Sequence, residues 1–104
     1  MPNEQSNIKE RTRYSVRYPD MYNVIMHNDD FTSMEFVVKV LRVVFLKELL
    51  TAQQLMLTVH KKGNAIVGTY TLDIATSKSQ RAMQMARQEN FPFKLTVEPV
   101  ELPF

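Results

Sequence analysis

The sequence predicts an α+β fold, a two-layer sandwich in which three helices pack against a three-stranded antiparallel sheet. Two observations support this prediction. Three short segments are rich in strand-forming residues or alternate apolar and polar side chains, and three longer segments repeat apolar residues at helical spacing. In chain order they give βααβαβ. Because 104 residues are enough for one core but too few for two, we expect one folded domain.

The first 20 residues differ from the rest of the chain. They are polar, lack apolar periodicity and end at Pro19-Asp20, so we expect a flexible N-terminal tail over residues 1–20 and a core domain over residues 21–104. The core begins with a strand at residues 22–26, which the polar segment 28–30 ends.

The first predicted helix opens with a capping signal. Thr32 followed three residues later by Glu35 forms a capping box, which predicts Thr32 as the N-cap and Ser33 as the first helical residue. The helix should run to about Phe45 or Lys47. Its apolar residues are Val37, Val40, Leu41 and Val44 in one stripe, with Met34, Val38 and Phe45 outside it. Such a helix is buried on more than one side or lends a face to a pocket.

The second helix is predicted between Thr51 and Gly63. Thr51 with Gln54 repeats the capping pattern, and glycine suits the position just past a helix end. The residues expected to face the core are Ala52, Leu55, Met56 and Val59.

The last three elements follow from the same kinds of signal. Residues 65–72 alternate enough to form the second strand. Thr76 or Ser77 is expected to cap a third helix that stops before Pro92, and residues 93–97 alternate again as the third strand.

Composition narrows the function classes. The 13 Lys and Arg are set against 11 Asp and Glu, and Lys61-Lys62 is the only adjacent basic pair, so nucleic-acid binding is disfavoured. Without cysteine there is no disulfide, thiol nucleophile or Cys-based zinc site. No apolar run approaches the roughly 18 residues that span a bilayer, and no signal peptide precedes the core. We therefore expect a cytoplasmic protein without a membrane partner.

Hydrogen-bond acceptors gather in one loop and on one helix. Asn28 offers an amide oxygen, Asp29 and Asp30 offer carboxylates, and a neutral His60 offers a ring nitrogen, a set that suits a cationic donor. Each feature alone also has a structural interpretation. A half-buried histidine on an apolar helix is more often structural, and an Asn-Asp-Asp loop is more often a turn that leads into a helix.

An enzyme is a weaker interpretation. His27 and His60 with nearby carboxylates form a conceivable metal site, but they lack the His-Glu-x-x-His spacing and His27 ends a strand. There is no Ser-His-Asp order, and with only Gly63 and Gly68 available a phosphate-binding loop is implausible.

Three segments resemble one known family. Residues 28–37 read Asn-Asp-Asp-Phe-Thr-Ser-Met-Glu-Phe-Val, residues 54–60 read Gln-Leu-Met-Leu-Thr-Val-His, and residues 63–68 read Gly-Asn-Ala-Ile-Val-Gly. Together they closely resemble ClpS, the adaptor that hands N-end-rule substrates to the Clp protease. The similarity runs from about Met21 to Val97. It implies a non-enzymatic adaptor without a cofactor.

The resemblance also implies a role for individual residues. Asn28, Asp29 and His60 would hold the α-ammonium group of a substrate's first residue, and Asp30 and Thr32 belong to the same loop. The apolar residues Met34, Val37, Met56 and Val59 would line the pocket for the first side chain, Leu, Phe, Tyr or Trp, with Met34 as its gate. Phe93 stands at the pocket edge where the family often has leucine, and Ser33 replaces the usual proline.

The implied partner is a ClpA-type unfoldase working with the ClpP peptidase. By resemblance, Asp73 and Lys78 would contact the N-terminal domain of that unfoldase, and the adaptor is expected to be a monomer. The alternative function is a small ribosome- or nucleic-acid-associated binding module, because a fold alone does not determine function.

Overall fold

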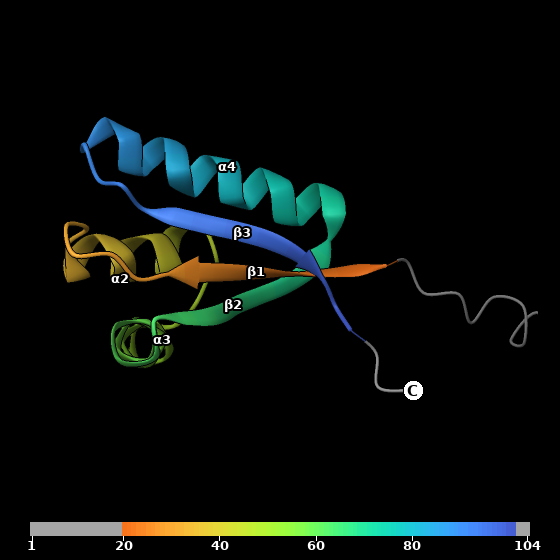
Figure 1. Cartoon of the computed structure of the whole chain (residues 1–104), viewed down its shortest axis with the longest axis horizontal. Coiled ribbons are helices and arrows are strands. Elements are labelled where there is room, and N and C mark those ends of the chain that lie inside the picture. The colour runs from red at the N-terminus through yellow and green to blue at the C-terminus, as the bar shows by residue number, and fades with distance from the viewer. Residues whose placement is uncertain (1–19, 102–104) are drawn as a thin grey trace, which may run out of the picture.

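The computed structural model describes residues 20–101, and its elements confirm the predicted order βααβαβ (Figure 1). The elements are β1 (Met21–His27), α2 (Met34–Val43), α3 (Leu49–Lys62), β2 (Asn64–Thr71), α4 (Leu72–Gln88) and β3 (Lys94–Pro99). Each strand begins and ends within two residues of its predicted range. The predicted tail lies, apart from Asp20, outside the described residues.

The sheet has the strand order β2-β1-β3, and both strand pairs are antiparallel (Figure 1). The central strand is therefore β1. Its last residue, His27, pairs with Asn64 at the start of β2 and with Lys94 at the start of β3. The loop that follows β1 consequently begins next to the turn between α3 and β2.

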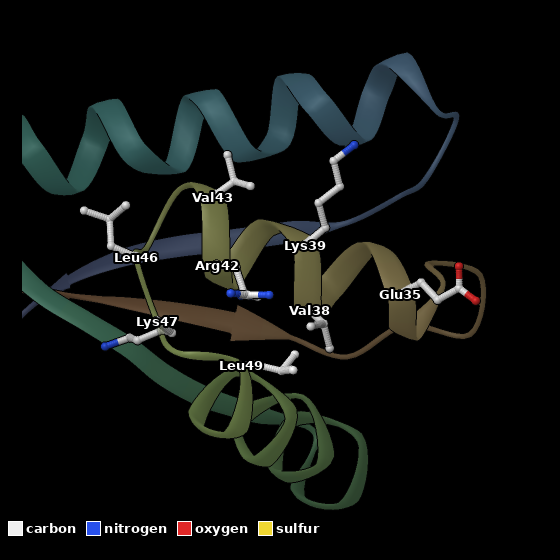
Figure 2. Close-up of a pocket in the computed structure, with 8 residues that line it drawn as sticks. All are labelled: Glu35, Val38, Lys39, Arg42, Val43, Leu46, Lys47 and Leu49. Atoms are coloured by element: carbon white, nitrogen blue, oxygen red, sulfur yellow. The ribbon is translucent and has the colours of Figure 1, made fainter.

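One face of the sheet carries the core. Val24 and Met26 of β1 have no exposed surface, and Val67 of β2 and Leu95 of β3 are also buried. The sheet passes behind the helices in Figure 2, where α2, α3 and α4 lie on this same side. The predicted two-layer arrangement is thus confirmed, because strand alternation directs one set of side chains toward the helices.

The opposite face of the sheet carries polar pairs. The hydroxyl of Thr69 on β2 donates a 2.6 Å hydrogen bond to Asn23 Oδ1 on β1, and His27 Nε2 lies 2.8 Å from Thr96 Oγ1 on β3. These cross-strand contacts satisfy polar groups outside the core. Within residues 20–101, no helix has the length and apolar character needed to cross a bilayer.

The start of α2 differs from the prediction. Ser33 is the N-cap: its backbone is extended (φ −69°, ψ 148°) and its Oγ accepts a 3.1 Å hydrogen bond from the N–H of Phe36. The prediction of Thr32 as N-cap is wrong, because the hydroxyl and the N–H of Thr32 both donate to Asp29 instead. The helix begins at Met34, one residue later than the capping box indicated.

The end of α2 also differs, because the helix stops at Val43 and not at Phe45 or Lys47. Leu46 has a positive φ of 55°, and the N–H of Lys47 donates a 3.0 Å hydrogen bond to the carbonyl of Leu41. A left-handed residue of this kind turns the chain out of the helix and satisfies a terminal carbonyl.

The predicted cap of α3 at Thr51 is wrong as well. The helix starts at Leu49, with Glu48 as an N-cap that makes no side-chain hydrogen bond. Ala52 is fully buried, and its N–H donates a 2.8 Å hydrogen bond to the carbonyl of Glu48. Packing of the first turn against the core therefore sets the helix start, while capping patterns describe only local preferences.

The third helix, α4, starts directly after β2 and not at the predicted caps Thr76 or Ser77. Thr71 is both the last residue of β2 and the N-cap of α4. Ala75 is fully buried in the first turns, and Asp73 supplies the negative charge that favours a helix N-terminus. The helix ends at Gln88, before Pro92 as predicted.

Candidate functional site

A cavity of about 200 Å³ lies where the loop after β1 meets α2 and α3. We call it the loop cavity. Nine of the ten side chains predicted to bind a ligand line it. They are Asn28, Asp29, Asp30 and Thr32 from the loop, Met34 and Val37 from α2, and Met56, Val59 and His60 from α3. The fold therefore brings together residues that lie about 30 positions apart in the sequence.

Asp29 organises the loop. Its Oδ1 accepts hydrogen bonds from the N–H groups of Phe31 (2.8 Å) and Thr32 (2.7 Å), and its Oδ2 accepts one from the hydroxyl of Thr32 (2.7 Å). Burial raises the pKa of the Asp29 carboxyl, but these three hydrogen bonds to the charged form outweigh it and lower the pKa below its ordinary value. Asp29 is therefore charged at neutral pH, and most of its lone pairs are already engaged.

A backbone contact fixes the loop against the end of α3. The N–H of Asn28 donates a 2.9 Å hydrogen bond to the carbonyl of Gly63. Gly63 is the C-cap of α3, with a φ of 92°, and its own N–H donates to the carbonyl of Val59. Because His60 lies in the last turn of α3, this contact brings Asn28 and His60 to the same cavity.

The apolar wall comes from two packed helices. Met34 and Val37 are one turn apart on α2, and Met56 and Val59 have the same spacing on α3. Val59 is buried, Val37 and Met56 are half-buried, and Met34 is 49% exposed. Met34 is therefore the lining residue of the apolar wall that is most accessible to solvent.

The polar side of the cavity suits a cationic ligand. The side chains of Asn28, Asp30 and His60 are exposed, so their acceptor atoms are accessible to a ligand, and Asp29 adds negative charge. Within residues 20–101 no group of three or more His, Cys, Asp or Glu side chains is placed to hold a metal ion. His27 contributes nothing here, because its ring contacts Thr96 on the far face of the sheet.

Phe93, the tenth predicted residue, does not line the loop cavity. It is buried in the core, where its ring meets the ring of Phe36 edge to face at a centroid distance of 5.6 Å. Phe36 lies on α2 beside Met34 and Val37, so Phe93 supports the helix that carries part of the apolar wall.

The two residues predicted to contact an unfoldase lie on α4 in different surroundings. Asp73 is exposed in the first turn. Lys78 is half-buried: its Nζ donates a 2.7 Å hydrogen bond to the carbonyl of Val44, and the same atom lies 5.4 Å from the ring centroid of Tyr70. Lys78 thus already ties α4 to the end of α2.

The sequence predictions lack two structural roles within this loop. Asp29 holds the loop through hydrogen bonds from Phe31 and Thr32, beyond the ligand contact that the resemblance implies. An Asp side chain that accepts from N–H groups two and three residues later forms a common turn, so the sequence carries a signal for this role. Ser33 is the N-cap and not the first helical residue, and serine is among the best N-caps.

A comparison with protein families identifies the chain. The model of the family described as ATP-dependent Clp protease adaptor protein ClpS matches residues 17–96. The chain belongs to the ClpS family. The description names members of this family as adaptors of a protease and not as the protease itself. It therefore supports the expectation of a non-enzymatic protein.

Several ClpS adapter proteins are similar along most of the chain. The protein from Desulforapulum autotrophicum is 45% identical over 98 residues, which cover 90% of this chain and 94% of that protein. The protein from Acetivibrio thermocellus is 44% identical over 96 residues, which cover 92% and 97%. The protein from Burkholderia cenocepacia is 42% identical over 99 residues, which cover 94% and 95%.

A solved structure of the ClpS family has the same fold. Agrobacterium tumefaciens ClpS2 bound to L-phenylalaninamide superposes with a TM-score of 0.77 at 37% sequence identity. The match covers 80% of this chain and 100% of that chain.

Proposed function

We propose that the loop cavity binds the free N-terminal residue of a protein substrate when that residue carries a bulky apolar side chain. The observation that carries this proposal is the joint presence, around one small cavity, of an apolar wall and several acceptors for a cation. A protein that begins with Leu, Phe, Tyr or Trp has a group for each of these features. Its α-ammonium group offers three donors to the acceptors, and its first side chain, which is attached to the same carbon, lies against the apolar wall.

The size of the cavity fits one side chain. A protein cavity of about 150 Å³ can hold benzene, so about 200 Å³ has room for a phenyl or isobutyl group. Burial of such a group contributes about 1.5–3 kcal/mol. The ligand of the related ClpS2 supports this assignment, because L-phenylalaninamide has a free α-amino group, a benzyl side chain and an amide in place of the next peptide bond.

The acceptors have distinct roles in this proposal. The amide oxygen of Asn28 and the neutral ring of His60 accept hydrogen bonds from the ammonium group, and Asp29 places a negative charge beside it while holding the loop in shape. A buried ammonium group needs such partners, because each missing hydrogen bond to a charged group costs about 1.5–3 kcal/mol. Asp30 adds a second carboxylate at the cavity rim.

The bound substrate is then delivered to a ClpA-type unfoldase, which feeds the ClpP peptidase. We place this role in the cytoplasm and assign it to a monomeric adaptor. Membership of an adaptor family of the Clp protease supports delivery in general. We propose that Asp73 and Lys78 contact the N-terminal domain of the unfoldase.

Fluorescence anisotropy with labelled peptides tests the binding step. A peptide that begins with Phe should bind, and the same peptide with an acetylated N-terminus should bind at least about tenfold more weakly, because it has lost the charged donor. A peptide that begins with Met should also bind more weakly. Equal affinity for the free and the acetylated peptide would overturn the proposal.

A variant tests the role of His60. His60→Ala removes one acceptor for the ammonium group, so affinity for the Phe peptide should fall about tenfold. Affinity for the acetylated peptide should change much less, because that peptide has no ammonium group. Equal losses for the free and the acetylated peptide would remove His60 from the site. Above a pH of about 7.7–8.0 the α-amino group of the peptide loses its charge, so affinity should also fall there.

A further inference from the structure

A second hollow, of about 600 Å³, lies on the outer side of α2 (Figure 2). It is lined by α2 residues from Glu35 to Val43, by the connection after α2 and by Leu49 at the start of α3, and we call it the α2 groove. It shares no lining residue with the loop cavity. The proposed function therefore leaves this groove unused.

The α2 groove exposes a group of apolar side chains. Leu46 is 76% exposed, Leu49 is 46% exposed and Val43 is 42% exposed. In Figure 2, Val38 and Leu49 point toward each other between α2 and α3, while Val43 projects on the side of α4. Single exposed apolar residues are normal on a protein surface, but several in one hollow indicate a contact surface.

Leu46 has an unusual combination of backbone and side chain. Its φ of 55° lies in the left-handed region, which is unfavourable for a residue with a Cβ and open to glycine. Burial of the Leu46 side chain contributes little stabilisation to offset this backbone conformation, because three quarters of the residue is exposed. A glycine here would end α2 equally well, so the leucine is better explained by a contact with another molecule.

The charges around the α2 groove are mainly positive. Lys39, Arg42 and Lys47 contribute three positive charges, and Glu35 contributes one negative charge at the end nearest the loop cavity (Figure 2). An acidic occupant is therefore favoured. Residues 1–19 of this chain carry four Lys or Arg against two Glu, which is the wrong sign for this surface.

We propose that the α2 groove docks an acidic amphipathic helix of a partner protein. The part of the surface that α2 forms, from Glu35 to Val43, extends about 12 Å along the helix axis, which corresponds to about two turns, and Leu46 and Leu49 lengthen it. A partner helix of that length presents apolar residues at helical spacing to Val43, Leu46 and Leu49, with acidic residues on its flanks opposite the basic rim. Because the two hollows share no lining residue, an N-terminal residue and this helix can be bound at the same time.

A pair of synthetic peptides tests the chemistry of the occupant. The probe is an N-acetylated helical peptide of about 12 residues with leucine at positions i, i+4 and i+7 and glutamate on its flanks. Acetylation removes the charged amine that the loop cavity is proposed to need. The control peptide carries lysine in place of each glutamate. The glutamate peptide should bind at least about tenfold more tightly, and its advantage should shrink as salt is raised.

Variants of this protein locate the binding surface. Leu46→Gly removes the side chain and relieves the left-handed backbone, so it should fold at least as well as the natural chain and yet bind the glutamate peptide about tenfold more weakly. Lys39→Glu combined with Arg42→Glu should reverse the preference toward the lysine peptide. Leu57→Asp, which changes an exposed leucine of α3 outside the groove, should bind as the natural chain does.

Three results would overturn the proposal. The first is equal affinity for the two peptides, and the second is unchanged peptide binding by Leu46→Gly. The third is self-association of the natural protein that is lost in Leu46→Gly, because that result would assign the α2 groove to a second copy of this chain. The affinity of each variant for a peptide beginning with Phe reports separately on the loop cavity. A failure at the α2 groove is therefore distinguishable from a failure of the proposed N-terminal-residue binding.

Discussion

Among single residues, Met34 combines contact with the loop cavity and access to solvent. It lies in the first turn of α2 and is 49% exposed, so a bound side chain passes close to it on entry. An unbranched thioether side chain adapts to flat or slender groups, but in the proposed binding mode it would occupy the space beside the Cβ of the ligand. We therefore propose that Met34 selects ligands by exclusion as well as by contact.

Met34→Ala should widen the range of accepted residues. Removal of the thioether leaves room for a second branch on the ligand's Cβ, so affinity for peptides beginning with Ile or Val should rise about tenfold or more. Peptide anisotropy measures this change. Leu57→Ala on α3 is a matched control, because it also shortens an exposed apolar side chain. Continued restriction of the Met34→Ala protein to unbranched and aromatic residues would contradict the gate role.

Asp29 links loop structure to pH. Its carboxyl has a pKa below the ordinary value in the folded protein, so the charged form favours folding at pH values above the unfolded pKa of about 3.9. That contribution is lost as the pH falls through the lowered pKa. Because the side chain is partly exposed, we expect the hydrogen bonds of Asp29 to contribute about 1 kcal/mol.

Asp29→Asn isolates this contribution. The amide keeps an acceptor for the backbone N–H groups but replaces the carboxylate oxygen that accepts from the Thr32 hydroxyl. The free energy of unfolding from urea titrations should differ between the two proteins at neutral pH, and the difference should shrink below about pH 4. A difference that stays constant down to pH of about 2 would show that the carboxylate is not responsible.

At the scale of the element, the end of α3 determines the shape of the site. Gly63 ends the helix with a positive φ of 92°, and its carbonyl accepts the hydrogen bond from Asn28 that fixes the loop. A Cβ added at Gly63 would have no atom within 4 Å. The cost of a larger residue therefore comes from the backbone alone, without a steric clash.

Gly63→Ala should lower the free energy of unfolding by about 1–2 kcal/mol. Gly63→Asn should cost less, because asparagine tolerates the left-handed region better than alanine. Urea titration gives both values. Affinity for a Phe peptide should fall in the same order if strain at Gly63 displaces the loop. Equal stability of the two variants would contradict the view that backbone conformation alone sets the cost.

Strand positions were predictable from the sequence, and helix starts were not. The first strand is rich in strand-forming residues, and β1 buries Val24 and Met26 on one face, so residues close in the sequence encode it directly. A capping pattern describes only a few neighbouring residues. The start of α3 depends on the burial of Ala52, and the start of α4 depends on the burial of Ala75, and both are properties of the folded molecule.

The candidate site could also be predicted only in part, because local sequence patterns do not report contacts that form in the folded molecule. Family motifs identified the nine residues around the loop cavity, because their order in the sequence is distinctive. The contact between Phe93 and Phe36 depends on how β3, α2 and the core pack, and no local pattern reports it. The α2 groove is likewise not evident from the sequence, because it depends on the end of α2 at Val43 and on the left-handed backbone of Leu46.

For the molecule as a whole, a hydrogen bond between α4 and the end of α2 distinguishes the two predicted partner contacts. Lys78 connects α4 to the carbonyl of Val44, whereas Asp73 is exposed. Lys78→Met should lower the free energy of unfolding by about 1 kcal/mol, because a helix-end carbonyl loses its donor. Asp73→Asn should change stability by less than about 0.5 kcal/mol.

The same two variants, assayed with a ClpA-type unfoldase and ClpP, separate delivery from folding. Asp73→Asn should slow degradation of a reporter beginning with Phe while its peptide affinity is unchanged, because an exposed carboxylate at a partner interface acts mainly through association. A full degradation rate for Asp73→Asn would remove Asp73 from the interface.

Folding and delivery can also be separated by shortening the chain. The sheet, the three helices and the loop cavity are all formed by residues 21–99, and the sequence before them has no apolar periodicity. A protein that begins at Tyr18 should therefore keep its melting temperature and its affinity for a Phe peptide. We propose that the unfoldase engages these N-terminal residues, so the unfoldase and ClpP should degrade the reporter more slowly with the shortened adaptor.

The matched control replaces residues 1–17 with a Gly/Ser segment of equal length, which restores the length of the N-terminal segment but not its amino-acid sequence. A full degradation rate with the shortened adaptor would show that delivery depends on the core alone. A rate restored by the Gly/Ser segment would show that the length of the segment matters and its side chains do not.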